Sequence, residues 1–132
     1  MANIFDRYHA AWEAQDPDQI AALHADDATF WMHDGTPAVQ GRAALRGRFG
    51  ALFARFPRMS FDTHRREFGQ AHWVLDYTMV LQLTDPSGAP FEARVKMLDV
   101  VNVNDAGQVT RKDVYLNGAE AYAAYARAGM AP

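Results

Sequence analysis

The sequence predicts an α+β fold in which helices come first and an antiparallel sheet follows. Apolar residues recur at helical spacing in the N-terminal part and again before Pro57, whereas apolar and polar residues alternate over much of residues 58–116. Turn-forming residues separate the predicted strands at short intervals, and no series of alternating strands and helices indicates a parallel sheet. A length of 132 residues predicts a single domain, 1–132.

The helices are predicted from the spacing of large apolar residues and from the residues that start or stop them. A first helix over residues 3–15 has three aromatic residues on one face, namely Phe5, Tyr8 and Trp12. Asp16 and Pro17 supply an N-cap and a proline at the first helical position, so a second short helix follows. A third helix lies between Gly41 and Pro57, and a short terminal helix covers residues 119–127.

The strands are predicted from β-favouring residues bounded by turns. A first strand ends at the turn-forming cluster 34–37, and hairpin turns at 85–88 and 104–107 join later strands. The predicted strands cover residues 27–33, 58–69, 71–83, 90–103 and 108–116.

Composition excludes several classes of function. Thirteen Lys and Arg against 16 Asp and Glu give a net charge of −3, which argues against nucleic acid as a partner. The absence of cysteine excludes disulfides, Cys-zinc sites and thiol nucleophiles. The five histidines show no metal-ligand spacing and no nucleotide motif occurs, so we expect neither metal nor cofactor. No signal peptide or membrane-spanning segment is seen, so we expect no membrane partner and a cytoplasmic location.

Asp99 is the first candidate for chemistry, because it interrupts a strongly apolar strand and shares a face with Val95 and Met97. A carboxyl group buried there needs a partner or a raised pKa, and both arrangements are typical of catalytic acids. The alternative is that this strand face is turned outward and that Asp99 pairs with a lysine or arginine of a neighbouring strand.

Asp113 is the second candidate, since its strand should pair with that of Asp99 across the 104–107 turn. If both carboxyl groups faced the same side, they could share one proton and act as acid and base. The alternation of side chains leaves this open, and the alternative is a surface aspartate balanced by Arg111 and Lys112.

His33 and Asp34 end the first strand, where side chains can reach the mouth of a pocket, and a histidine there would suit proton transfer. The alternative is an ordinary exposed pair. Tyr8 has a hydroxyl that needs a partner if it is buried, so it could donate to a ligand or to Asp99, or serve packing alone.

Two stretches resemble a known family. Residues 8–29, YHAAWEAQDPDQIAALHADDAT, followed by residues 39–45, VQGRAAL, are similar to the opening of nuclear transport factor 2-like domains. The match is best with their SnoaL-like and ketosteroid-isomerase-like branch, and the segment 112–116, KDVYL, fits the end of that pattern. The resemblance implies a cone-shaped α+β barrel, in which a curved antiparallel sheet wraps around the N-terminal helices and encloses an apolar cavity, and it implies a homodimer.

The resemblance also implies roles for individual residues. Tyr8 corresponds to the tyrosine of the isomerases' oxyanion hole, and Asp99 corresponds to the protonated aspartic acid beside it. Met32 stands where the isomerases have their aspartate base, so His33 or Asp34 would have to act instead. Asp113 is similar in context to the acidic residue on the last long strand of SnoaL-type polyketide cyclases and of the more distant limonene-epoxide hydrolases. The hydrolases also use an arginine two residues before their first aspartate, and this chain has Met97 at that position.

These observations predict a cofactor-independent isomerase, cyclase or hydrolase that acts by proton transfer on an apolar carbonyl, polyketide-like or steroid-like compound. The alternative is a non-catalytic ligand-binding or dimerisation module, with Leu98 and Val100 suited to an interface. The candidate catalytic residues are Tyr8, His33, Asp34, Asp99 and Asp113. The candidate ligand-binding residues are Trp12, Trp31, Met32, Phe49, Phe53, Trp73, Tyr77 and Met97.

Overall fold

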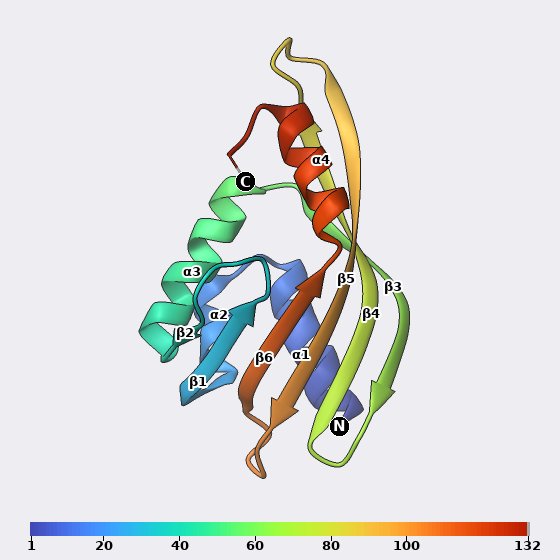
Figure 1. Ribbon diagram of the computed structural model, residues 1–132. Coiled ribbons are helices and arrows are strands. Elements are labelled where there is room, and N and C mark those ends of the chain that lie inside the picture. The colour runs from blue at the N-terminus through green and yellow to red at the C-terminus, as the bar shows by residue number, and fades with distance from the viewer. Residues whose placement is uncertain (132) are drawn as a thin grey trace.

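The computed structural model describes residues 1–131, which form four helices and six strands (Figure 1). In chain order they are α1 (Ala2–Glu13), α2 (Pro17–Ala22), β1 (His24–Met32), β2 (Val39–Gln40), α3 (Arg42–Arg55), β3 (Met59–Phe68), β4 (His72–Thr84), β5 (Pro90–Val103), β6 (Val109–Leu116) and α4 (Gly118–Ala128).

The strands form one curved sheet in the order β2-β1-β6-β5-β4-β3. The later strands pair antiparallel, as predicted, and β4 and β5 share the longest register. β1 instead lies parallel to β6, and the sheet is not closed. These two strands are far apart in the sequence and no hairpin fixes their relative direction, so local patterning could not predict it.

The predicted α+β class is confirmed, and most boundaries agree within two residues. The helix predicted over residues 3–15 ends two residues earlier, and β1 begins at His24 rather than at residue 27. The short strand β2 was not predicted, because two residues carry no recognisable alternation.

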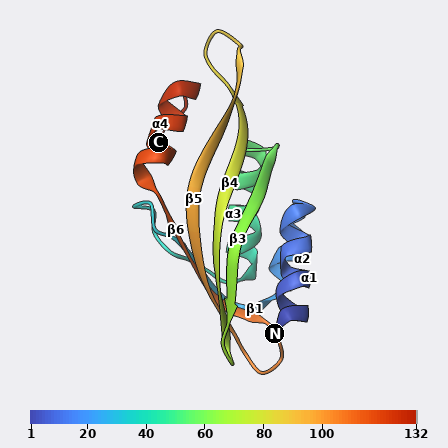
Figure 2. The same cartoon turned by 90° about the vertical axis from the view of Figure 1, so that its right-hand side faces the viewer.

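Helices α1 and α3 pack their aromatic faces against one face of the sheet, which we call the inner face. Phe49 of α3 contacts Trp12 of α1 and Phe30 of β1 edge to face, at centroid distances of 5.0 and 5.1 Å. Along β5 the odd-numbered side chains from Ala93 to Val103 are buried on this face. Helices α1 and α2 lie together at one end of the sheet, while α4 packs against β5 (Figures 1 and 2).

None of the helices in residues 1–131 is long and apolar enough to cross a membrane.

Candidate active site

Three neighbouring strands bring Tyr77, Asp99 and Lys112 together on the inner face of the sheet. Asp99 of β5 lies opposite Leu75 of β4 and Val114 of β6, so Tyr77 and Lys112 are its diagonal neighbours. The Tyr77 hydroxyl donates a hydrogen bond of 2.9 Å to Asp99 Oδ1. The Lys112 ammonium Nζ lies 3.5 Å from Asp99 Oδ2. We call these three residues the Asp99 cluster.

The Asp99 cluster is almost completely buried, since Asp99 is 1% and Lys112 is 3% exposed. Burial raises the pKa of Asp99 above its usual range, although Lys112 and the Tyr77 hydroxyl act in the opposite direction. Burial lowers the pKa of Lys112, although the carboxylate of Asp99 opposes this. The pKa values of the two groups therefore lie closer together than those of a carboxyl group and an amine in water.

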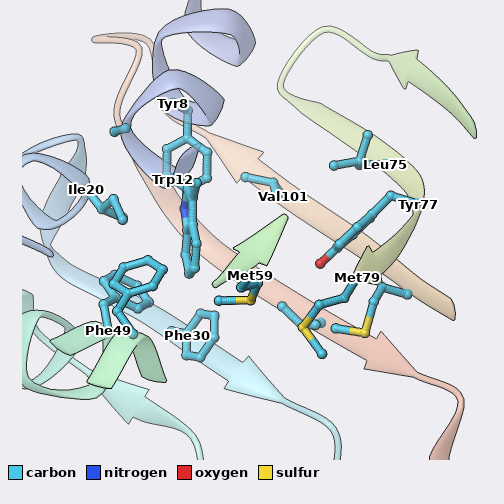
Figure 3. Close-up of a cluster of buried hydrophobic side chains, with 14 of the residues drawn as sticks. Tyr8, Trp12, Ile20, Phe30, Phe49, Met59, Leu75, Tyr77, Met79 and Val101 are labelled. Atoms are coloured by element: carbon cyan, nitrogen blue, oxygen red, sulfur yellow. The ribbon is translucent and has the colours of Figure 1, made fainter. Parts of the chain in front are cut away.

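Tyr77 is held in its neutral form beside Asp99. Burial, together with the negative charge of Asp99, raises the pKa of the Tyr77 hydroxyl far above its usual range. Figure 3 shows the hydroxyl directed toward the centre of the apolar cluster. Tyr77 therefore acts as a hydrogen-bond donor that orients the carboxyl group of Asp99.

An apolar cavity of about 30 Å³ adjoins the Asp99 cluster. This volume holds a water molecule or two, so a larger ligand requires side chains to move. Four of the lining residues are methionines, whose unbranched side chains repack readily. The full lining consists of His9, Trp12, Phe30, Met32, Leu52, Met59, Phe61, Leu75, Tyr77, Met79, Met97, Asp99, Lys112 and Val114.

Two nitrogen atoms of cavity-lining residues lack hydrogen-bond partners within residues 1–131: Trp12 Nε1 and His9 Nε2. Burial lowers the pKa of His9 to about 3, so its ring is neutral near pH 7. The Trp12 ring also faces the Lys112 ammonium, whose Nζ lies 4.1 Å from the ring centroid. Most buried polar groups in proteins are paired, so these two nitrogens are exceptions in the described part of the chain.

Tyr8 does not contact Asp99, contrary to the expectation from the isomerase pattern. Its hydroxyl lies 3.2 Å from His24 Nε2, and the other ring nitrogen of His24 donates to the Ile20 carbonyl at 2.8 Å. Tyr8 is therefore the donor to a neutral His24, whose pKa burial lowers to about 4. In Figure 3, Tyr8 lies beside Trp12 and away from Tyr77. Tyr77 occupies the place beside Asp99 that we expected for Tyr8.

Asp113 does not join Asp99, so of the two alternatives the structure agrees with the one in which Arg111 balances Asp113. The register between β5 and β6 is regular from residue 97 to residue 102, which puts Asp113 on the outer face of the sheet. There its carboxylate accepts hydrogen bonds from Arg111 at 2.8 and 3.1 Å and lies 2.9 Å from His33 Nε2. These contacts, led by that with Arg111, lower the pKa of Asp113.

His33 and Asp34 also lie away from the Asp99 cluster. The His33 ring is stacked between Trp31 and Tyr115, at centroid distances of 4.4 and 4.2 Å. Asp34 accepts hydrogen bonds from the backbone and hydroxyl of Thr36 and lines a separate surface hollow. Neither residue lines the cavity beside the Asp99 cluster.

The predicted ligand-binding residues fall into three groups. Four of them, Trp12, Met32, Tyr77 and Met97, line the cavity. Phe49, Phe53 and Trp73 are buried in the surrounding core and do not line it. Trp31 is 36% exposed and lies on the outer face with His33.

Lys112 is the site residue that sequence reasoning missed. The alternative given for Asp113 treats Lys112 as a surface charge, although Lys112 shares a face of its strand with Val114 and Leu116. The alternative in which Asp99 pairs with a lysine or arginine of a neighbouring strand is correct about the partner. It is wrong about the direction, because the pair is buried on the inner face and does not point outward. The sequence did contain a signal for this pair. Across a hairpin at 104–107, residues 99 and 112 are diagonal neighbours on the same face of the sheet, so their side chains can meet.

Over residues 1–131, no group of three or more His, Asp or Glu side chains could hold a metal ion. The Asp99 cluster itself offers a carboxyl group, an amine and a phenol, with the indole ring of Trp12 nearby.

Solved structures share this fold over nearly the whole chain. A protein of Catenulispora acidiphila with a ketosteroid isomerase-like fold, in complex with trimethylamine, is 19% identical over 97% of this chain and 93% of its own, with a TM-score of 0.79. SalBIII, an epoxide hydrolase/cyclase-like enzyme of pyran ring formation in the polyether salinomycin, is 18% identical over 90% and 92%, with a TM-score of 0.74.

RV0760c of Mycobacterium tuberculosis, in complex with estradiol-17beta-hemisuccinate, is 18% identical over 88% of this chain and 92% of its own, with a TM-score of 0.72. No curated protein sequence matches the chain significantly. The family model of the SnoaL-like domain matches residues 5–112, and the chain therefore belongs to the SnoaL-like domain family.

Proposed function

We propose that this protein is a cofactor-independent enzyme that moves a proton on an apolar carbonyl compound bound in the inner cavity. The observation that carries this proposal is the buried contact between Asp99 and Lys112 at the wall of an apolar cavity. Perturbed acid and base groups in such a cavity are typical of active sites.

Each member of the Asp99 cluster has a separate task in the proposed reaction. In its ionised form, Asp99 removes a proton from the carbon next to the ligand carbonyl, and the electron pair of that bond moves onto the carbonyl oxygen. Lys112, as an ammonium ion, stabilises the enolate or gives it a proton. Tyr77 keeps the carboxyl group oriented through its 2.9 Å hydrogen bond.

Two of the three solved structures favour an apolar, ring-containing ligand, whereas the Catenulispora acidiphila protein was solved with trimethylamine. SalBIII acts in pyran ring formation, and RV0760c was solved with a steroid derivative. In the present chain the four cavity methionines, Met32, Met59, Met79 and Met97, can move aside to enlarge the cavity for such a molecule. We therefore extend the proposal to isomerisation, cyclisation or hydrolysis of polyketide-like or steroid-like compounds.

Deuterium exchange at carbon tests the proposal without knowledge of the natural substrate. We expect the protein to accelerate the exchange of the α-protons of cyclopentanone in D₂O, measured by NMR, above the rate in buffer. In protein labelled with ¹³C at the methionine methyls, cyclopentanone should shift the four cavity methionines and leave Met1 and Met130 unchanged. Absence of accelerated exchange would overturn the proposal, and the methionine shifts then show whether cyclopentanone binds.

A non-catalytic binding module is the second candidate function. It is favoured by Met32, which lines the cavity where the resembling isomerases have their base. Methionine shifts without any acceleration of exchange would support this candidate and reject the enzyme.

We also propose that the protein is a homodimer that uses the outer face of the sheet. Trp31, Leu98 and Tyr115 lie there with exposed fractions of 36, 36 and 45%, and Tyr115 is directly opposite Leu98. Light scattering should give the mass of a dimer for the wild type and of a monomer for Tyr115→Glu, because a charge on this face opposes its burial. A monomeric wild type at micromolar concentration would contradict the proposal.

A further inference from the structure

Lys112 is a buried amine with access to the cavity, and the proposed proton transfer uses it only as a cation. Its side chain is 4% exposed, and it reaches the cavity between the Trp12 ring and the carboxyl group of Asp99. Lysines desolvated in apolar pockets are activated as nucleophiles toward carbonyl groups, since removal from water favours the neutral amine.

We propose that Lys112 forms a covalent imine with an aldehyde or ketone bound in the cavity. The inference rests on the proposed function in that it places the same class of ligand in the same cavity. It adds a covalent step that the family resemblance does not include, because no lysine nucleophile is part of the pattern that this chain resembles.

The Asp99 cluster supplies the proton transfers that the step needs. A proton first passes from the Lys112 ammonium to Asp99 across their 3.5 Å contact, in the direction that burial favours, since burial lowers the pKa of Lys112 and raises that of Asp99. The free amine attacks the carbonyl carbon, and the oxygen takes the proton from Asp99 to give a carbinolamine.

Loss of water completes the step. The carbinolamine nitrogen returns a proton to Asp99, which passes it to the departing hydroxyl group, so that water leaves and a protonated imine remains. One ammonium ion and one carbonyl compound thus give one iminium ion and one water. The charge of the site is unchanged, because the iminium nitrogen keeps the Asp99 carboxylate as its partner.

The Asp99 carboxylate then lies beside an iminium ion, which withdraws electrons from the neighbouring carbon more strongly than a carbonyl group does. Removal of the α-proton by Asp99 would follow from the same contact of 3.5 Å. The imine therefore makes the α-proton easier for Asp99 to remove, in a chain that has Met32 where the isomerases have their base.

The chain offers an internal control for a trapping experiment, because its only lysines are Lys96 and Lys112. Lys96 lies on the same strand as Asp99 but is exposed on the opposite face. Propanal with sodium cyanoborohydride near neutral pH reduces an imine to a stable propyl-lysine, which peptide mass spectrometry assigns to one lysine or the other.

We expect Lys112 to be labelled at least about tenfold faster than Lys96 and the N-terminus. Cyclopentanone should slow the labelling of Lys112 and leave that of Lys96 unchanged. Lys112→Arg, which keeps the positive charge, should retain labelling only at Lys96 and the N-terminus. Labelling of those two groups alone in the wild type would overturn the inference, and this result does not depend on any variant folding.

The failure of this inference can be distinguished from failure of the proposed function. Exchange of cyclopentanone protons without labelling of Lys112 rejects the imine and leaves proton transfer by Asp99 in place. Labelling of Lys112 without exchange supports the imine and rejects the proton-transfer enzyme.

Discussion

Lys112→Met should lower the free energy of unfolding by about 3–5 kcal/mol near neutral pH, as measured by urea denaturation. The substitution keeps the length of the side chain but removes the cation that lies 3.5 Å from the buried carboxyl group of Asp99. Asp99 must then either remain charged in an apolar environment or bind a proton, and both cost free energy.

The loss should depend on pH in a defined direction. Burial raises the pKa of Asp99 in the folded state, and removal of Lys112 takes away the largest opposing influence. In the folded variant, Asp99 keeps its proton up to a higher pH than it does in the unfolded chain. The contribution of Asp99 to the stability of the variant is therefore greatest at low pH and decreases as the pH rises through the folded pKa. The deficit of Lys112→Met should be larger at about pH 8 than at about pH 5.

A double variant distinguishes loss of the interaction between Asp99 and Lys112 from loss of side-chain packing. Asp99→Asn combined with Lys112→Met removes both charges, and the double variant should be more stable than the sum of the single losses by about 1–3 kcal/mol. Additive losses with no dependence on pH would contradict the assignment of Asp99 and Lys112 as a coupled buried pair.

Asp99→Asn should slow the exchange of cyclopentanone α-protons by about 10²–10⁴-fold, the range typical for loss of a general acid or base. Asparagine has nearly the shape of aspartate, and its amide oxygen can still accept the hydrogen bond from Tyr77. It cannot take up and return a proton at accessible pH, so the chemistry should be lost while the cavity remains.

Asp113→Asn is the matched control, because it makes the same chemical change one strand away. Asp113 lies on the outer face with Arg111 and His33 and does not line the cavity. Its replacement should leave the exchange rate unchanged. It should reduce the stability of the fold by no more than about 1–2 kcal/mol, because the contact is partly exposed to solvent.

The fold followed from sequence patterns because its strands and helices carry strong periodicity. Along β5, buried and exposed side chains alternate without a break from Glu92 to Lys96 and beyond, and the turn at 104–107 sets the direction of β6. The parallel contact between β1 and β6 could not be predicted, because it joins segments some eighty residues apart and depends on how the whole sheet curves.

The site was predicted only in part. The sequence does not show which face of a strand is buried or which residues from distant segments come into contact. The alternation along β5 singled out Asp99 correctly as a carboxyl group on an apolar face. Alternation along β6 puts Lys112 and Asp113 on opposite faces but does not say which face is buried, and the possibility of a bulge left the facing open until the register with β5 was known. Tyr77, and not Tyr8, donates the hydrogen bond to Asp99, while Tyr8 contacts His24. This difference depends on where α1 lies over the sheet, and periodicity alone does not determine that position.

The most direct measurement is the rate of deuterium incorporation into cyclopentanone by wild type, Asp99→Asn and Asp113→Asn, compared at equal protein concentration with folding verified by circular dichroism. The account predicts fast exchange for wild type and Asp113→Asn and a rate near that of buffer for Asp99→Asn. Equal exchange by wild type and Asp99→Asn, with both proteins folded, would contradict a proton transfer carried by Asp99.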